Sequence, residues 1–393
     1  LAWGREQNLR IDGHCPELVG DDLQAYIAAG ILTDHESVSL PEMLEKYRLG
    51  MKVILRRGSL QEPVRAGDLV AALPDTTNLL LSTDGCIFLD DILDKGHMNK
   101  ALQAIVAEGV DPVTAIQMAT INVARAYGVD HHIGSIAPGR RADLVVVSDL
   151  QNFEVEAVFL GGKKFDPEAY SIPPYNHQPE VLNTVKMGKV SPETFQIKTP
   201  ITSGEVKVRV MTIIAGTVAT REEHESLPVK DGLLQPDVSR DLLKVAVFDR
   251  YREGGYHALG IVRGFGIKKG AFGGSVGQDS QNLVVVGSSD EDMALVVNTI
   301  REMQGGIVFA ADGQVVAKVS LPVAGIMSST EPRGLQRQFR ELHQKLWDMG
   351  SKQDNPSFDL SLLLTCAVIP ELKITNRGLV DALSGQFVPL LLE

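Results

Sequence analysis

The spacing of apolar positions over the first 130 residues predicts short strands separated by helices. Compact apolar runs at residues 51–55 and 78–82 predict buried strands. Ser39 and Asp111 stand where helices should begin, and Pro112 favours a first helical turn. Helical spacing predicts helices at residues 22–29, 40–49, 64–72, 98–108 and 112–127. Strands that alternate with helices predict parallel βα units.

The pattern changes after residue 133. A Pro-Gly turn at residues 138–139 precedes an apolar run at 144–147 that we expect to be a buried strand. Residues 155–160 and 163–165 flank Gly161-Gly162 and predict a hairpin. Residues 134–167 should thus form a small β subdomain segment, and the proline-rich residues 168–195 a linker.

The remaining residues, 196–393, predict a second domain of the α/β class. Apolar runs indicate strands at residues 206–214, 243–248 and 283–287. A hairpin should join residues 307–310 to 315–319 through Asp312-Gly313. Helical spacing predicts helices at residues 291–303 and 334–349.

Composition narrows the range of partners. The chain has 38 Lys and Arg against 50 Asp and Glu, which gives a formal charge of −12. This excess of acid argues against nucleic-acid backbones and anionic membranes as partners, although it permits an uncharged nucleobase as a substrate. Three cysteines without a CxxC pair fit a reducing cytoplasm. The chain begins at Leu1 without a signal segment, which we interpret as a missing N-terminus.

Three segments of the first domain place a metal-type side chain directly after a predicted strand. The side chains are His14, His35 and Asp84. The active site of a βα barrel is built at the carboxyl ends of its strands, so these three groups should converge. Imidazole and carboxylate suit a divalent cation that keeps one position open for water. Taken singly, each histidine is more often a hydrogen-bonded surface group and Asp84 a turn residue; the case for a metal rests on all three.

The sequence around these residues resembles that of bacterial adenine deaminases of the amidohydrolase superfamily. Gly13-His14-x-Pro16, Asp34-His35-Glu36 and Thr83-Asp84 are similar to the metal motifs of barrel strands 5, 6 and 8. Residues 136–144 are similar to a segment found across the superfamily. The segments that point specifically to adenine deaminases lie in the second domain, at residues 241–247, 264–271, 282–287, 290–294, 321–327 and 368–375.

The resemblance implies a fold and a reaction. The fold would be an incomplete (β/α)8 barrel with strands 5–8 in residues 1–133, followed by the small β subdomain and, over residues 196–393, the adenine deaminase C-terminal α/β domain. The reaction would be hydrolytic deamination of adenine to hypoxanthine and ammonia in purine salvage, with two divalent metals, manganese or iron, or alternatively zinc. His14, His35 and Asp84 would be ligands, and Asp84 also the catalytic base. A cytoplasmic homo-oligomer is expected, and this chain alone should be inactive, because the ligands of strands 1 and 4 fall outside it.

Several positions differ from the residues usual in the family, and these differences leave the identity of the substrate open. Gly85 replaces a second Asp, Arg57 a Glu, and Gln278 and Gln281 two histidines. Two alternatives therefore remain: the substrate could be another purine or a cyclic amide, or the protein could be an inactive paralogue. Taken alone, residues 278–282 read as a glycine-rich turn and His97 as a helix cap. The resemblance implies substrate-binding roles for Arg56, Ser59, His97, Gln278 and Asp279. Cys15 and Cys86 adjoin metal-type residues but are assigned to packing.

Overall fold

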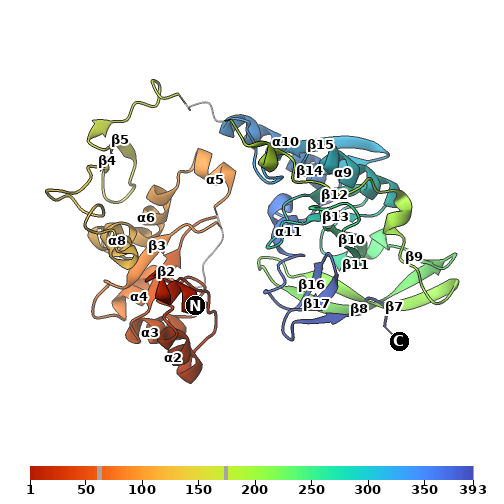
Figure 1. Cartoon of the computed structure of the whole chain (residues 1–393), viewed down its shortest axis with the longest axis horizontal. Helices are drawn as coiled ribbons and strands as arrows, with labels where there is room; N and C mark the ends of the chain where they lie inside the picture. Colours follow the sequence, from red (N-terminus) through yellow and green to blue (C-terminus); the bar gives the residue numbers. More distant parts are fainter. Residues whose placement is uncertain (60–63, 86, 172–175, 393) are drawn as a thin grey trace. The chain divides into compact units, whose positions relative to one another are not determined.

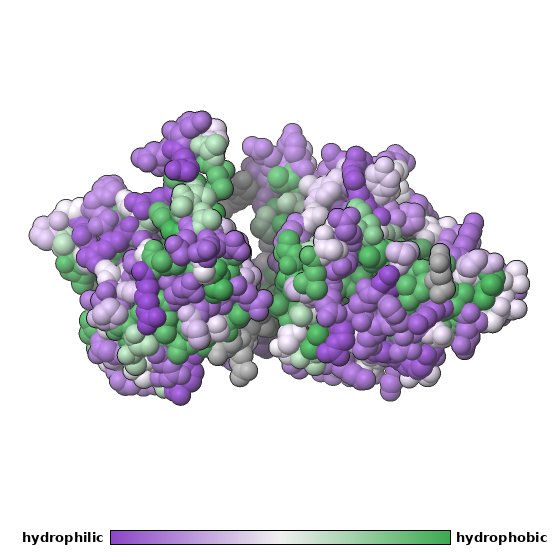
Figure 2. Space-filling view, turned by 90° about the horizontal axis from the view of Figure 1, so that it is seen from below, coloured by the Kyte–Doolittle hydropathy of each residue, from purple (hydrophilic) through white to green (hydrophobic). Residues whose placement is uncertain are grey.

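The computed structural model describes residues 1–59, 64–85, 87–171 and 176–392, and the chain forms two compact units (Figure 1). The first unit is residues 1–173 and the second is residues 174–393. Each has a buried apolar core of its own. No helix in the described ranges is long and apolar enough to cross a membrane. Polar residues dominate the face shown in Figure 2, with apolar residues scattered among them.

The first unit is built on a parallel sheet. Strands β1 (Thr33–Asp34), β2 (Lys52–Arg56) and β3 (Leu79–Ser82) lie in the order β1-β2-β3. A parallel bridge between Ile11 and Ile31 adds a fourth chain segment before β1. Four successive segments therefore run in the same direction, and within the described ranges they form an open sheet without barrel closure. Their carboxyl ends share one edge, which is where the predicted ligands occur.

Helices separate these strands and supply the core. The main ones are α2 (Gly20–Ala28), α3 (Leu40–Arg48), α4 (Ala66–Ala71) and α6 (Met98–Ala107). Two short helices, α1 (Ala2–Glu6) and α5 (Leu89–Asp94), have no buried residues. Apolar side chains of α3, α4 and α6 pack with those of β2 and β3 and form the buried core of this unit.

The helix expected over residues 112–127 is wrong as a single element. It divides into α7 (Pro112–Ala119) and α8 (Ile121–Tyr127), with Thr120 at φ −130° and ψ −90°. The Thr120 hydroxyl donates to the Ile116 carbonyl, and the buried Asn122 amide donates to the carbonyls of Thr76 and Leu79. These side-chain hydrogen bonds compete with continuous helix geometry and anchor α8 beside β3.

Residues 144–164 form a small antiparallel sheet. Its strands are β4 (Leu144–Val147), β5 (Val155–Leu160) and β6 (Lys163–Lys164), which confirms the predicted hairpin. The expected burial of residues 144–147 is wrong, because Val145 is 59% exposed and Val146 is 43% exposed. An apolar run indicates a strand, but its burial depends on what packs against the sheet, and antiparallel sheets can leave one face open.

The second unit contains a nine-stranded sheet in the order β15-β14-β12-β13-β10-β11-β7-β8-β9. The central strands β10 (Leu243–Phe248) and β13 (Leu283–Gly287) are buried on both faces. Around them lie β11 (His257–Arg263), β12 (Ala271–Gly274), β14 (Gly306–Ala311) and β15 (Gln314–Ser320). At the other side are β7 (Ser203–Ile213), β8 (Thr220–Lys230) and β9 (Leu233–Leu234).

Two layers cover this sheet. One face packs against α9 (Asp290–Glu302) and the short helix η2 (Pro192–Phe195), and Val185 and Met187 of the proline-rich segment are buried with them. The other face packs against α10 (Pro332–Asp348), α11 (Pro356–Leu362) and the strands β16 (Leu372–Thr375) and β17 (Gly378–Asp381). β18 (Gln386–Val388) completes a small sheet with β16 and β17. Short helices η1 (Pro179–Leu182) and η3 (Val238–Arg240) lie in the connections.

One partly buried carboxyl, that of Asp359, should make the stability of the second unit depend on pH. Burial, and secondarily the Asp354 carboxylate, raise the pKa of Asp359 to about 7. Between about pH 5 and pH 6 the unfolded chain ionises Asp359 and the folded chain keeps it protonated, so the unfolding free energy should fall by up to about 1.4 kcal/mol per pH unit in this window. Asp359→Asn cannot ionise at this position and should lack this pH-dependent loss of stability. Its unfolding free energy should therefore rise relative to that of the parent as the pH approaches 7. Urea unfolding followed by Trp347 fluorescence in a Trp3→Phe background measures the difference, and equal pH profiles would contradict it.

Candidate metal centre

The carboxyl edge of the parallel sheet carries the candidate site. His14 follows the Ile11 bridge, and His35 and Glu36 follow β1 directly. Arg56 is the last residue of β2, and Asp84 stands two residues beyond the end of β3. Parallel strands end at the same side of a sheet, which explains why residues spread over 70 positions lie on one edge.

His14, His35 and Glu36 form a compact group of potential ligands. The two imidazole rings meet edge to face with their centroids 4.3 Å apart. Glu36 Oε1 lies 3.5 Å from His14 Nδ1 and 3.5 Å from His35 Nε2. One ligand atom from each of the three residues lies within 4.8 Å of the other two. Two imidazoles and a carboxylate are a donor set that fits a divalent transition metal.

Arg56 joins this group to Asp84. Its guanidinium Nη1 lies 2.9 Å from Glu36 Oε1 and 3.2 Å from Asp84 Oδ2. Asp84 has φ 52°, and its backbone N–H donates to the Ser82 hydroxyl at 2.9 Å. The sequence pattern had grouped Asp84 with the histidines and had not assigned Glu36. The structure places Glu36 against both rings and places Asp84 against Arg56, on the same edge.

The surroundings of Asp84 favour its ionised form. Burial raises the pKa of this carboxyl, but the Gly85 N–H, the Arg56 guanidinium and the charge of His35 together outweigh burial and hold it below the usual value. Asp84 is therefore a carboxylate at neutral pH, able to accept a proton from a neighbouring donor. Its side chain is 37% exposed, so solvent reaches it.

Two of the residues to which substrate binding was assigned occupy this same region. Thr83, adjacent to Asp84, shares a hydrogen bond of 3.0 Å between its hydroxyl and His97 Nε2, and His97 also forms the N-cap position of α6. Ser59 accepts a hydrogen bond of 2.8 Å from the Phe88 N–H at the start of α5, so its hydroxyl positions that helix. Of the residues expected to bind substrate, Arg56 is hydrogen-bonded to Asp84 itself, and His97 is hydrogen-bonded to the adjacent Thr83.

The departure at Arg57 has a structural partner. Arg57 Nε and Nη2 donate to the two carboxylate oxygens of Glu108 at 2.9 Å and 2.7 Å, and Nη2 also donates to the Val64 carbonyl. The charge at position 57 is therefore neutralised within the protein. Gly85, by contrast, faces open space, since a Cβ placed there would meet nothing within 4 Å.

Gln278, Asp279 and Gln281 lie in the second unit. The Gln278 N–H donates to the Ser361 carbonyl at 2.8 Å, and Asp279 Oδ2 lies 3.8 Å from Cys366 Sγ. Gln281 has φ 55°, and its carbonyl accepts from Arg250 Nε. The buried Arg250 also donates to Thr184 Oγ1 at 2.8 Å and to the Ala324 carbonyl at 2.9 Å, so it fastens this turn to two other segments.

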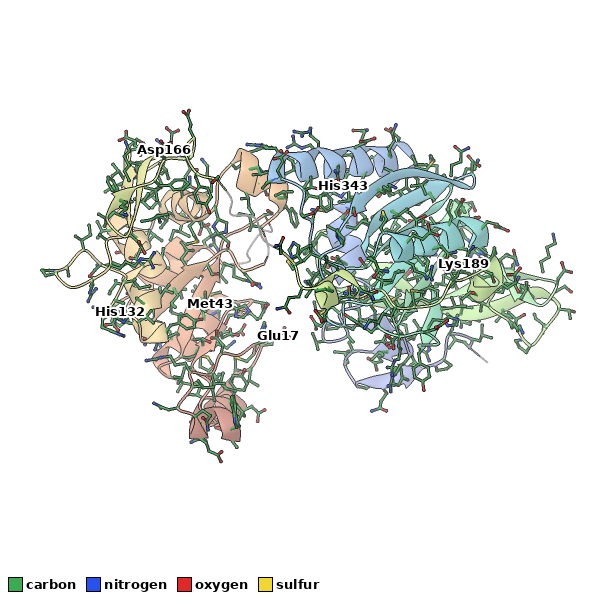
Figure 3. The ribbon with its side chains drawn as sticks, turned by 45° about the horizontal axis from the view of Figure 1, so that its top comes forward. Glu17, Met43, His132, Asp166, Lys189 and His343 are labelled. Atoms are coloured by element: carbon green, nitrogen blue, oxygen red, sulfur yellow. The ribbon has the colours of Figure 1, made fainter. Side chains whose placement is uncertain are left out.

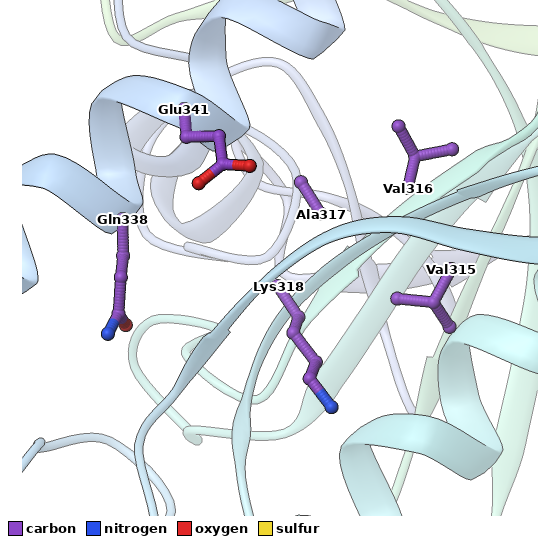
Figure 4. Close-up of a pocket in the computed structure, with 6 residues that line it drawn as sticks. All are labelled: Val315, Val316, Ala317, Lys318, Gln338 and Glu341. Carbon is purple, nitrogen blue, oxygen red and sulfur yellow. The ribbon is translucent and has the colours of Figure 1, made fainter.

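Two surface hollows lie away from all of these residues. One lies between β15 and α10 and is shown in Figure 4. Val315, Val316, Ala317, Lys318, Gln338 and Glu341 line it. The other is lined by residues of 155–158 and 164–167 in the small β sheet. Neither contains a predicted site residue, so the candidate chemistry remains with the strand-end group.

Comparison with known proteins decides the family. Residues 4–165 match the Amidohydrolase family, and residues 217–386 match the Adenine deaminase C-terminal domain. An adenine deaminase from Methanococcoides burtonii is 37% identical over 382 residues, which is 96% of this chain and 64% of that protein. The chain is an adenine deaminase homologue of the amidohydrolase family.

A second adenine deaminase agrees with this assignment. An adenine deaminase from Sinorhizobium fredii is 39% identical over 95% of this chain and 65% of its own length. This homologue thus spans about 65% of the length of the curated relatives that it matches. Among solved structures, an amidohydrolase from Thermotoga maritima MSB8 is similar over 39% of this chain and 43% of its own, with 19% identity and a TM-score of 0.30.

Proposed function

We propose that the complete gene product hydrolyses adenine to hypoxanthine and ammonia. The observation that carries the proposal is the group of His14, His35 and Glu36 at the strand ends, joined through Arg56 to Asp84, in a chain homologous to adenine deaminases. The four parallel segments would belong to strands 5–8 of a (β/α)8 barrel in residues 1–133. Residues 134–167 and the α/β domain 196–393 would follow it. Of the expected linker 168–195, Val185, Met187 and Phe195 pack in the core of the second unit and so belong to that unit.

The ligand set supports a divalent metal at this edge. His14, His35 and Asp84 are the proposed ligands, and Glu36 joins them because its carboxylate faces both imidazoles. Manganese or iron, alternatively zinc, suits these nitrogen and oxygen donors, and two ions are expected for the complete centre. When bound, such an ion supplies a water whose pKa is lowered from ~15.7 toward ~7.

Asp84 is the residue proposed to move protons. It would accept a proton from the attacking water and deliver it to the exocyclic amine that leaves C6 of adenine as ammonia. Adenine and one water are thereby converted to hypoxanthine and one ammonia. Arg56 contacts the Asp84 carboxylate and would orient it, while His97, held by Thr83, would contact the heterocycle.

A different heterocycle is the second candidate, favoured by the site's departures. Gly85 leaves an open space beside Asp84, where the family usually places a second Asp. A cyclic amide or another purine could occupy such a site with different contacts. A cytoplasmic homo-oligomer is the proposed form of the protein, with a small-molecule purine as substrate and neither nucleic acid nor membrane as a partner.

An activity panel tests the proposal. The complete gene product, loaded with Mn²⁺ or Fe²⁺, should release ammonia from adenine with matching formation of hypoxanthine, and a chelator-treated sample should not. Other aminopurines and cyclic amides form the remainder of the panel. Turnover of a cyclic amide without turnover of adenine would replace the proposed substrate. Absence of both turnover and bound metal would identify an inactive paralogue.

A further inference from the structure

A buried ion cluster lies beneath the candidate metal centre. Lys46 of α3 and Asp34 of β1 are both 0% exposed, and Glu42 is 4% exposed. Lys46 Nζ lies 2.9 Å from Asp34 Oδ2 and 2.6 Å from Glu42 Oε1. The same ammonium donates to Ser37 Oγ at 3.0 Å. Every charged group of this cluster is thereby paired inside the first unit.

The cluster holds the loop that follows His14. Both polar backbone groups of Cys15 bind to it, because its N–H donates to Asp34 Oδ1 at 3.0 Å and its carbonyl accepts from Lys46 Nζ at 2.6 Å. Further along the loop, the Glu17 N–H donates to Glu42 Oε1 at 2.8 Å. Glu17 is labelled in Figure 3, as is Met43, which follows Glu42 in α3. The two peptide groups on either side of the Cys15 Cα, the first of which links Cys15 to His14, are therefore both held by the cluster.

The same cluster holds the loop that follows His35. Ser37 Oγ donates to Asp34 Oδ2 at 2.6 Å, and the Val38 N–H donates to Glu42 Oε2 at 3.0 Å. His35 and Glu36 lie between Asp34 and Ser37, which both belong to this hydrogen-bond network. The two loops that carry the ligand group are thus tied to one ammonium and two carboxylates.

A buried cluster of this kind calls for an explanation beyond packing. Removing charges from water is costly, and apolar residues of similar volume would often stabilise a fold as well or better. Here the charged atoms bind backbone groups on two separate loops, which apolar side chains cannot do. Hydrogen bonds around metal ligands orient those ligands and tune their affinity.

We propose that Lys46, together with Asp34 and Glu42, is a positioning residue of the metal centre. Its ammonium sets the distance between the loop of His14 and the loop of His35 and Glu36. This inference rests on the proposed metal centre. Lys46 acts through the loops and not by contact with substrate.

Binding of Co²⁺ to the complete gene product tests this role. Lys46→Met removes the ammonium and keeps the length of the side chain. Measured by visible absorption at 15 °C on protein shown by circular dichroism to be folded, Lys46→Met should weaken Co²⁺ binding by roughly 10- to 100-fold. The amides of Cys15 and Glu17 should exchange with solvent deuterium at least about tenfold faster, because the loop loses its anchor.

The Arg57–Glu108 ion pair provides the matched control. It is a part-buried pair in the same unit, and among the described residues its side chains form hydrogen bonds with Arg56, Val64 and Ala66 and with no residue of either loop. Glu108→Gln should lower the melting temperature while Co²⁺ affinity and the exchange of Cys15 and Glu17 stay as in the parent. If Lys46→Met does not fold, Asp34→Asn provides a smaller change, because the amide oxygen can still accept from Cys15 while the charge pair with Lys46 is lost.

The outcomes separate the two proposals. Unchanged Co²⁺ affinity in a folded Lys46→Met or Asp34→Asn variant would overturn the positioning role and leave the metal centre standing. A complete gene product that does not bind Co²⁺ would instead contradict the metal centre itself. If Glu108→Gln weakened Co²⁺ binding as much as Lys46→Met does, the inference would also be overturned, because a general loss of stability would then explain both effects.

Discussion

Replacing Asp84 by Asn should lower kcat on adenine by roughly 10²–10⁴, the usual contribution of a positioned proton-transfer group. Asn keeps the size of the side chain and removes the basic carboxylate that the Gly85 N–H and Arg56 hold ionised. The measurement uses the complete gene product at saturating metal, so that loss of a metal does not limit turnover. Near-normal turnover with metal fully bound would show that another carboxylate is the base.

His14→Ala is the comparison that separates proton transfer from metal binding. His14 has no proposed part in proton transfer, and its ring lies against His35 and Glu36. Activity of this variant should therefore recover in part as the metal concentration rises, whereas that of Asp84→Asn should not. If the two variants responded to metal in the same way, separate roles for His14 and Asp84 would be contradicted.

Glu36→Gln should weaken Co²⁺ binding by about 100-fold or more, since loss of a direct ligand should cost at least as much as loss of a group behind one. The reason is geometric: Glu36 Oε1 lies 3.5 Å from a nitrogen of each histidine. Gln has nearly the same shape but supplies a neutral oxygen in place of a carboxylate. Titration of the complete gene product with Co²⁺, followed by visible absorption, measures the change.

The matched control for Glu36 is again Glu108→Gln, which removes one carboxylate from an ion pair with arginine. Glu36 also pairs with Arg56 at 2.9 Å, so the control corrects for loss of an arginine contact as such. Equal Co²⁺ affinity in the parent and in Glu36→Gln would mean that Glu36 serves only to hold Arg56. The ligand group would then have to be completed by Asp84 alone.

The local pattern of apolar residues was sufficient to predict the strands that are buried on both faces. The apolar runs at residues 243–248 and 283–287 predicted β10 and β13 with their observed bounds. Central strands of a covered sheet must be apolar on both faces, so their sequence is continuous and easily recognised. The hairpin around Asp312-Gly313 was equally plain, because the turn residues themselves favour the required backbone.

Elements stabilised by charged partners were harder to recognise. β8 carries Glu222, Glu223 and Glu225, a composition that does not favour a strand by itself. Its glutamates are paired with arginines of two other strands. Arg209 of the adjacent β7 pairs with Glu222, and Arg263 of β11, one strand beyond β7, pairs with Glu223 and Glu225. Strand formation there depends on partners that are brought close only when the sheet assembles.

The candidate site divides in the same way. The sequence by itself determined that His14 and His35 follow strand-like segments, because period and position are local properties. Only the tertiary structure decided that Glu36 faces both rings, that Arg57 pairs with Glu108, and that Lys46 binds the Cys15 carbonyl 31 positions away. The physical reason is that a buried charge is stable only where its partners already lie, and those partners come from segments that meet after the chain has folded.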